Sequence, residues 1–507
     1  MIVDSLTSYT QVLTQHHWLF LLALPALILA GAFLFVLVGL SPFFAIALAL
    51  LVLAVYLALI YPRILLCALL ILRMSLDYSS EYISIALSAN RTATLSQLVG
   101  AGVFVVGTIF LLRHRRALKS LPLIIPMAVL LGFTAVTLIY SIDQEATLKE
   151  FVRMADLGLI FFIAHTVFRS PSQYRQLLGA ILLSSAVPIA FGVYQYLGGM
   201  GLVDETIGVA RIYGTFSHPN IFSLYLFILL PVVLISYLHL GGESWKRVAV
   251  VSLGALYLAI LLLTFTRIAL VSLFVALAVI TVFWRRKLLI PLVVAALVVV
   301  MGSPPLRTRV TQTLHPMPGD SITWRLTLWD DTVTQVLGDE RWWLGYGGDT
   351  FAAVAEHMRG ERFGEYEAAH NDFIKFFVEG GLIGLAVYLF YLGALAHLLW
   401  KQYVAAHGER RRAAVFLVLL AVSNAMAVAG LSDNVYKNTP LQWIFLALLG
   451  ASLAVYGHRS QSIRDCLKSC HSEADAEESR STRASGNEML RYAQHDTEGR
   501  GAFLNSL

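Results

Sequence analysis

Long uninterrupted apolar runs are the feature that most restricts how this 507-residue chain can fold. Runs such as 18–40 and 248–266 reach the roughly 18 residues that a helix needs to cross a hydrocarbon core. Hydrophobic residues make up 58% of the chain and charged residues 14%, against about 45–50% and about 25% in soluble domains. Inside a bilayer only helices or closed barrels satisfy the backbone, and these runs lack the alternation of barrel strands. The sequence therefore predicts an all-α fold, a polytopic transmembrane helical bundle.

The apolar runs predict about 12 to 14 membrane spans. They lie near 18–40, 43–61, 63–76, 92–112, 121–141, 150–168, 177–197, 219–240, 248–266, 268–284, 288–302, 381–400, 414–430 and 441–456. The lower number applies if the short segments that meet at Pro62 and Arg63 are not separate spans. We expect four regions: an N-terminal bundle (1–302), a large loop (303–380), C-terminal helices (381–456) and a disordered tail (457–507).

Basic residues in the short loops orient these spans. Clusters such as Arg113–Lys119 and Arg285–Lys287 all fall on one side of the predicted bundle, which is then the cytoplasmic side and receives both termini. The opposite, periplasmic face receives 198–218, the turn at Arg267, and the large loop. That loop is too long for a simple connection and is rich in tryptophan, so we expect a partly helical cap on the bilayer surface.

Several functional classes are not indicated by the sequence. The net charge of +5 does not indicate nucleic-acid binding, because many of the basic residues lie in short loops between the apolar runs. Three cysteines, Cys67, Cys466 and Cys470, form neither a disulfide framework nor a zinc motif. The histidines lack the close spacing of metal ligands, and we expect neither a metal nor another cofactor.

Two arginines of the predicted periplasmic face are candidates for binding an anion. Arg211 lies in RIYGTFSHPN, shortly before a span that starts near Pro219, and a helix N-terminus favours anions. Arg267 lies between two apolar runs, where a charge is costly and usually functional. Two guanidinium groups on one face can together hold a diphosphate. An arginine at either position can instead contact lipid headgroups, and Arg267 can simply mark a tight turn.

His370 opens the segment HNDFIKFFVEGG. A helix over 370–379 would place His370 beside an apolar stripe, and Gly380-Gly381 would break that helix before the next span. An imidazole at the mouth of the bundle is suited to general-base catalysis, although a lone histidine is often structural. Two weaker candidates are Arg325, which is interpreted as shaping the outer cap, and Asp433, which is interpreted as a solvated loop residue or a helix cap.

The order of these motifs resembles the O-antigen ligase and O-antigen polymerase-like superfamily. RIYGTFSHPN resembles that family's R-x-x-G-T-F-x-x-P-N element, and Arg267 lies in a Thr-Arg pair like its Ser/Thr-Arg element. His370-Asn371, followed after nine residues by Gly381 and then by Gly384, matches the ligase pattern H-[N/S/Q]-x9-G-x-x-[G/T/Y]. The resemblance covers about 205–450.

This resemblance implies a GT-C-like, metal-independent glycosyltransferase of the bacterial inner membrane. Its donor would be a glycan on undecaprenyl diphosphate, held by Arg211 and Arg267, with His370 as general base and Asn371 orienting the histidine or a sugar hydroxyl. The acceptor would be lipid A-core for a ligase, another lipid-linked repeat for a polymerase, or a protein Ser/Thr for an oligosaccharyltransferase. The ligase pattern favours lipid A-core. A solute transporter is a further alternative, but the repeats and midplane polar groups typical of one are not evident.

Overall fold

A computed structural model describes residues 53–77, 84–88, 91–204, 207–240, 244–315, 321–359 and 368–457. The described chain is almost entirely helical, with two antiparallel hairpins, β1–β2 (Ser84–Ser88, Arg91–Thr94) and β3–β4 (Leu202–Asp204, Val209–Arg211). The predicted all-α polytopic fold is confirmed. The predicted span at 18–40 and the tail after 457 lie outside the described residues.

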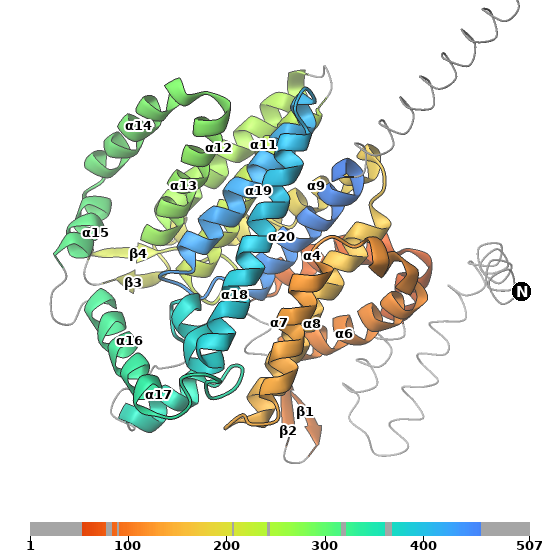
Figure 1. The fold of residues 1–507 in the computed structure, drawn as a ribbon. Helices are drawn as coiled ribbons and strands as arrows, with labels where there is room; N and C mark the ends of the chain where they lie inside the picture. The colour runs from red at the N-terminus through yellow and green to blue at the C-terminus, as the bar shows by residue number, and fades with distance from the viewer. Residues whose placement is uncertain are drawn as a thin grey trace, which may run out of the picture. The chain divides into compact units, whose positions relative to one another are not determined.

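Figure 1 shows the helices of the described residues in chain order. They are α4 (Pro62–Ser75), α6 (Leu95–Arg113), α7 (Ile124–Thr137), α8 (Gln144–Val167), α9 (Pro171–Leu183), α10 (Ala186–Leu197), α11 (Pro219–His239), α12 (Ser244–Leu263), α13 (Arg267–Trp284), α14 (Leu289–Gly302), α15 (Pro304–Leu314), α16 (Ser321–Gly338), α17 (Phe351–Arg359), α18 (Asp372–Ala405), α19 (Arg410–Ala429) and α20 (Thr439–Ser452).

Within the described residues, eight helices are long and apolar enough to cross a membrane. The number rises to nine if α14 and α15, which meet at 104°, are counted as one broken span. Part of the difference from the 12 to 14 spans predicted above has a physical cause. The apolar segments 121–141 and 288–302 form helices of only 14 residues, too short to span alone.

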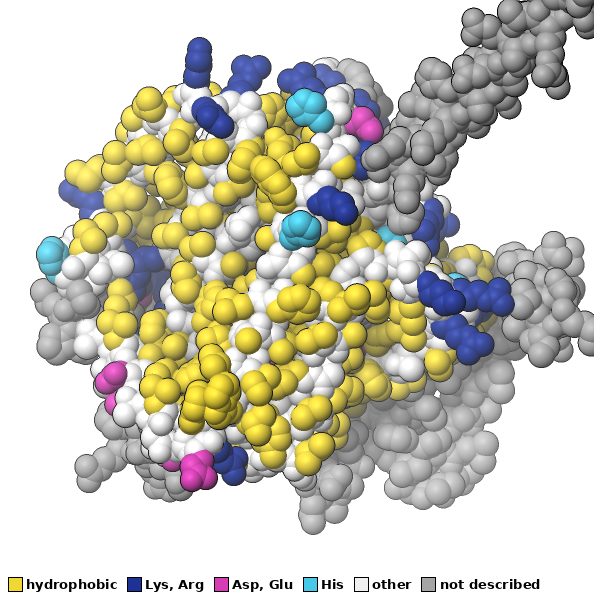
Figure 2. All heavy atoms as spheres, viewed as in Figure 1, with side chains coloured by type: hydrophobic (Ala, Val, Ile, Leu, Met, Phe, Trp, Pro, Cys, Tyr) yellow, Lys and Arg dark blue, Asp and Glu magenta, His cyan; other side chains and the backbone are white. Residues whose placement is uncertain are grey.

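The helices bury their surfaces unequally. α19 and α20 are buried along most of their length, whereas α6, α12 and α13 leave most of their apolar side chains uncovered by protein. Figure 2 shows apolar side chains spread over one face of the molecule, with most Lys and Arg at its edges. An apolar surface of this extent is unfavourable in water and suited to lipid. The chain is a multi-pass membrane protein.

The predicted loop 303–380 contains three helices, α15, α16 and α17. Helices α16 and α17 share a small hydrophobic core with the start of α18. This core includes Leu328, Phe351 and Val378. Two of the tryptophans predicted to lie at the membrane surface, Trp324 and Trp342, pack against this core. The loop is therefore partly helical, as predicted, and it is held to α18 by apolar packing.

Helix α18 contains a sharp break at Gly381, where φ is 61° and ψ is −160°. The break was predicted, but the start of the helix was not: α18 begins at Asp372, so His370 lies outside the helix. Breaking a helix exposes backbone groups that must find other partners. The segment 342–347 supplies them through bonds from Leu382 N to Trp342 O (2.9 Å), Ile383 N to Trp343 O (3.2 Å), Tyr346 N to Val378 O (3.2 Å) and Gly347 N to Glu379 O (2.8 Å).

A buried ionic network joins α8 to the first turns of α18. Lys375 Nζ lies 2.6 Å from Glu379 Oε2 and 3.2 Å from Glu150 Oε1. Arg153 donates two hydrogen bonds to the Glu150 carboxylate, at 2.7 and 2.6 Å, and a third to the Tyr436 carbonyl oxygen at 2.8 Å. Removing one member would leave an uncompensated buried charge, so the network fixes α8, α18 and the segment around Tyr436 relative to one another.

Replacing Gly381 by alanine is expected to destabilise the fold. An alanine would adopt a strained φ, and its Cβ would collide with the Trp343 carbonyl group. We expect a loss of at least about 1–3 kcal/mol, measured as a lower thermal unfolding midpoint of the detergent-solubilised protein. Gly393→Ala is the matched control, because Gly393 lies in the same helix and an added Cβ meets nothing within 4 Å. Equal midpoints for the two variants would contradict this interpretation of the break.

Candidate active site

Arg211, at the end of β4, is held by hydrogen bonds to two other segments of the chain. Its Nε donates to the Thr264 carbonyl oxygen at 2.8 Å, and its Nη2 donates to Thr266 Oγ1 at 2.9 Å and Asn220 Oδ1 at 3.0 Å. Nη1 makes no hydrogen bond within the described residues and lies 3.7 Å from Asp204 Oδ2. The guanidinium is buried and rigidly oriented, with one nitrogen left for a further partner.

Arg267, the second predicted anion-binding residue, is the first residue of α13. It follows a three-residue turn, 264–266, whose central residue Phe265 has a φ of 48°. Thr266 of this turn binds Arg211, so the two predicted arginines lie at the same turn. Arg267 Nη1 donates to Thr313 Oγ1 at 3.0 Å and to the Arg309 carbonyl oxygen at 3.3 Å, which docks α15 against α13.

A further arginine, Arg309 of α15, is buried beside this turn and forms an ion pair with Asp204. Sequence reasoning did not single it out, because nothing in PPLRTRVTQTL distinguishes Arg309 from the exposed Arg307. We call Arg211, Arg267, Arg309 and Arg325 the cationic cluster.

The charges of this cluster affect one another. Burial, followed by the positive charges of Arg267 and Arg325, lowers the pKa of Arg211 to about 10, against the opposing effect of Asp433. Burial also lowers the pKa of Arg325. An excess of buried positive charge is unfavourable without a counter-ion, so the cluster is suited to binding an anion.

His370 and Asp433 lie together at the edge of the cationic cluster. His370 Nδ1 is 3.7 Å from Asp433 Oδ1, and its ring contacts Trp324 edge-on. His370 has a φ of 46°, unusual for a residue other than glycine, so the surrounding structure holds it in place. Burial alone would raise the pKa of Asp433, but His370 and Arg325 outweigh it and keep that pKa below its ordinary value.

Asp433 was interpreted from the sequence as a solvated loop residue or a helix cap, and the structure contradicts the solvated alternative. It is buried and receives a hydrogen bond from Asn220 Nδ2 at 3.0 Å. Arg325 was predicted to shape the outer cap. Its Nη1 also donates to the Ser432 carbonyl oxygen at 2.8 Å, which fixes the segment that carries Asp433.

Asn371 does not orient His370 through any hydrogen bond in the structure. Its Oδ1 caps α18 by accepting from Phe373 N and Ile374 N, and its Nδ2 donates to the Leu431 carbonyl oxygen at 3.0 Å. The Asp372 backbone N–H donates to the Gly430 carbonyl oxygen at 2.7 Å. These bonds join the start of α18 to the segment that leads to Asp433, so Asn371 has a supporting structural role.

Two residues of this site were not assigned a role from the sequence, although both lie in RIYGTFSHPN. Asn220 joins the two halves of the site, because its side chain accepts from Arg211 and donates to Asp433. His218 is the N-cap of α11, where its Nδ1 accepts from Asn220 N at 3.1 Å. Their position beside a predicted helix start was the available signal, since capping residues are expected there.

The donors of this site do not fit a metal. Within the described ranges, no group of three or more His, Cys, Asp or Glu residues is arranged to hold an ion. At the site itself four arginines accompany the carboxylates of Asp204 and Asp433, an arrangement that favours an anion over a cation.

Comparison with protein families identifies the region that contains much of this site. Residues 252–389 match the family described as O-antigen ligase. This match supports the assignment of the chain to an O-antigen ligase-like superfamily. The matched region runs from α12 into α18 and contains Arg267, Arg309, Arg325 and His370. A search of curated proteins finds no match. The family supports a glycosyltransferase-type enzyme that uses lipid-linked glycans.

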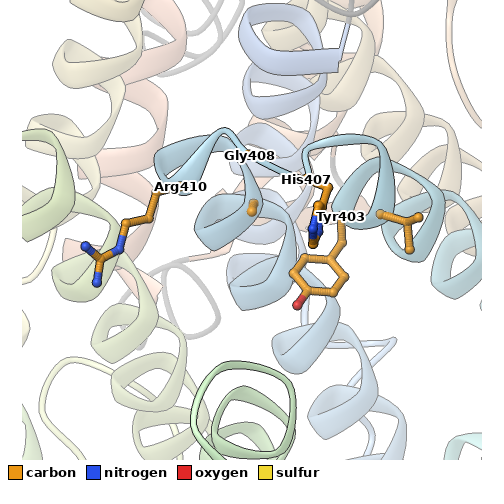
Figure 3. Close-up of a pocket in the computed structure, with 6 residues that line it drawn as sticks. Tyr403, His407, Gly408 and Arg410 are labelled. Carbon is orange, nitrogen blue, oxygen red and sulfur yellow. The ribbon is translucent and has the colours of Figure 1, made fainter.

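A hollow of about 390 Å³ lies at the turn between α18 and α19, at the other end of α18 from His370. Tyr403, His407, Gly408 and Arg410 are among the residues that line it (Figure 3). In this view Arg410 extends away from Tyr403 and His407, on the other side of Gly408. The polar groups do not converge on one point, so this hollow is a poorer candidate for catalysis than the site at His370.

The histidine at the start of α11 predicts a measurable pH dependence of stability. Burial, followed by the charge of Arg211, lowers the pKa of His218 to about 4 from an ordinary value of 6.5. Between these values the unfolded chain binds the proton more tightly, so stability falls as the pH falls from about 6.5 to about 4. We expect the unfolding midpoint of His218→Asn, which retains a capping side chain, to fall less over this range. Parallel pH profiles for the variant and the unchanged protein would contradict the neutral state of His218 in the folded protein.

Proposed function

We propose that this protein is an inverting glycosyltransferase that moves a glycan from undecaprenyl diphosphate to a hydroxyl acceptor. We propose lipid A-core as the acceptor, as in an O-antigen ligase. The observation that carries the proposal is the convergence of buried arginines with a His–Asp pair. Arg211 and Asp433 are 222 positions apart in the sequence, and the side chain of Asn220 joins them directly.

The cationic cluster is suited to the diphosphate of the donor. Arginine binds phosphate oxygens through a planar set of N–H donors, and Arg211 is fixed so that Nη1 remains free of hydrogen bonds within the described residues. Arg267 lies at the same turn. As the bond between the sugar and the diphosphate breaks, negative charge develops on the leaving oxygen, and oriented guanidinium groups stabilise it. No metal ion is needed for this role.

His370 is positioned to act on the acceptor. With the Asp433 carboxylate beside Nδ1, the proton of a neutral imidazole is favoured on Nδ1, which leaves Nε2 as the basic nitrogen. Nε2 takes the proton of the acceptor hydroxyl as its oxygen bonds to the anomeric carbon. The bond from that carbon to the diphosphate oxygen breaks, and the electron pair leaves with undecaprenyl diphosphate. One displacement of this kind inverts the anomeric configuration. Asp433 stabilises the resulting imidazolium.

We further propose that the site faces the periplasm, with both termini cytoplasmic, in the bacterial inner membrane. The basic clusters of the short loops support this orientation. The proposed domain limits remain those predicted from the sequence: 1–302, 303–380, 381–456 and 457–507.

A polymerase that adds repeats to another lipid-linked glycan is the second candidate, because the same donor site and base would serve it. A protein O-oligosaccharyltransferase would also use this chemistry. The three differ only in the acceptor. A solute transporter is disfavoured because the described polar site gathers at one end of the helices that carry it, next to β4 and the starts of α11, α13 and α18.

Substitution of His370 is expected to abolish transfer without abolishing folding. His370→Ala should lower the rate of glycan transfer by about 100-fold or more, measured with purified protein, lipid-linked donor and acceptor. His315→Ala is the control, because His315 is an exposed histidine after α15 and should leave the rate unchanged. A His370→Ala protein with full activity would rule out the general base.

Substitution of Arg267 by lysine tests the diphosphate site. Lysine keeps the charge but loses the planar set of donors, so we expect transfer to fall at least about tenfold. Arg307→Lys, an exposed arginine of α15, is the matched control. Equal activity of the Arg267→Lys and unchanged proteins would show that the geometry of the guanidinium is not used.

Deletion of the gene distinguishes the acceptors. A ligase is expected to leave lipid A-core without any O-chain on gels of lipopolysaccharide. A polymerase deletion would instead leave a single repeat on the core. An unchanged lipopolysaccharide profile would contradict both proposals and would direct the search to protein acceptors.

A further inference from the structure

The N-cap histidine of α11 has a nitrogen that the fold does not use. We propose that His218 is a donor-binding residue, which donates a hydrogen bond from Nε2–H to a phosphate oxygen of the diphosphate. This inference rests on the proposed function and adds a neutral ligand to its cationic site.

The fold selects the tautomer that such a role requires. Nδ1 of His218 accepts a hydrogen bond from the Asn220 backbone N–H at 3.1 Å. A nitrogen that accepts in this way carries no proton, so a neutral imidazole must carry its proton on Nε2. Within the described residues Nε2 makes no hydrogen bond, and the residue is only partly buried. The Nε2–H group is therefore available to a ligand.

Hydrogen bonds also place this ring beside the proposed diphosphate site. The residue that His218 caps, Asn220, bonds directly to Arg211 and to Asp433. The charged groups that act on His218 are Arg211, Arg325, His370 and Asp433, which include members of both halves of the site. His218 thus lies where the donor diphosphate and the catalytic base are expected to meet.

A neutral hydrogen-bond donor has an advantage at this position. The cationic cluster already contains four arginines, and these would repel a further positive charge as long as no lipid-linked donor is bound. Burial and the charge of Arg211 lower the pKa of His218 to about 4, so the ring is neutral at physiological pH. It can therefore add a hydrogen bond to the phosphate without adding charge repulsion to the empty site. The start of α11 contributes its positive dipole end to the same region.

The experiment must separate this hydrogen bond from the capping role of the side chain. Serine is a strong N-cap but has no N–H group, so His218→Ser keeps the cap and removes the donor. Asparagine keeps both a capping oxygen and an amide N–H, although with a shorter reach. The two variants therefore differ in the proposed hydrogen bond to phosphate and share the capping role.

We would measure the binding of undecaprenyl diphosphate without a glycan to each purified protein in detergent, together with KM and kcat for transfer. His218→Ser is expected to weaken binding about tenfold, as for the loss of one hydrogen bond to a charged group. It should raise the KM for donor similarly and change kcat less. The affinity of His218→Asn is expected to lie between those of His218→Ser and the unchanged protein. The unfolding midpoints of the two variants should agree.

Other outcomes would overturn the inference. Unchanged affinity in His218→Ser would exclude the hydrogen bond, and so would weakened binding accompanied by a lowered unfolding midpoint, because the defect would then be structural. Arg267→Lys in the same assay distinguishes a failure of the proposed function from a failure of the role of His218. If it weakens binding while His218→Ser does not, the proposed function stands and the role of His218 is wrong. If the unchanged protein does not bind undecaprenyl diphosphate, both fail.

Discussion

The hydrogen bonds of the Arg211 guanidinium are the interaction on which the site depends. They tie the end of β4 to the first turn of α11 and to the turn before α13. Burying this charge is costly unless its hydrogen bonds are satisfied. Because Thr264, Thr266 and Asn220 satisfy three of them, the remaining nitrogen is held in a fixed direction at little further entropic cost. That property distinguishes a binding group from an arginine that merely reaches the headgroups.

A second set of constraints holds the base. The break at Gly381 allows the segment 342–347 to pair with α18, and the ionic network of Glu150, Arg153 and Lys375 fixes the same helix to α8. The strained backbone of His370 is therefore anchored to a rigid element. The donor half and the acceptor half of the site are built by different parts of the chain, and Asn220 connects them.

The apolar runs were sufficient to predict the fold class, because burial in lipid leaves helices as the consistent solution. Motif spacing also indicated Arg211, Arg267 and His370, which the structure brings to one region. The burial of Asp433 and the bond of Asn371 to the Leu431 carbonyl oxygen could not be predicted, because both depend on the contact between the start of α18 and residues 430–433. Arg309 could not be predicted, since helical periodicity alone does not show which arginine of α15 faces Asp204.

The most direct test of this account is a structure of the protein bound to undecaprenyl diphosphate in a lipid nanodisc, determined by electron cryomicroscopy. The account predicts that the phosphates lie between Arg211 Nη1 and the Arg267 guanidinium, on the side of the site that His370 and Asp433 occupy. A diphosphate bound elsewhere, for example in the hollow at the α18–α19 turn, with the cationic cluster unchanged, would contradict it.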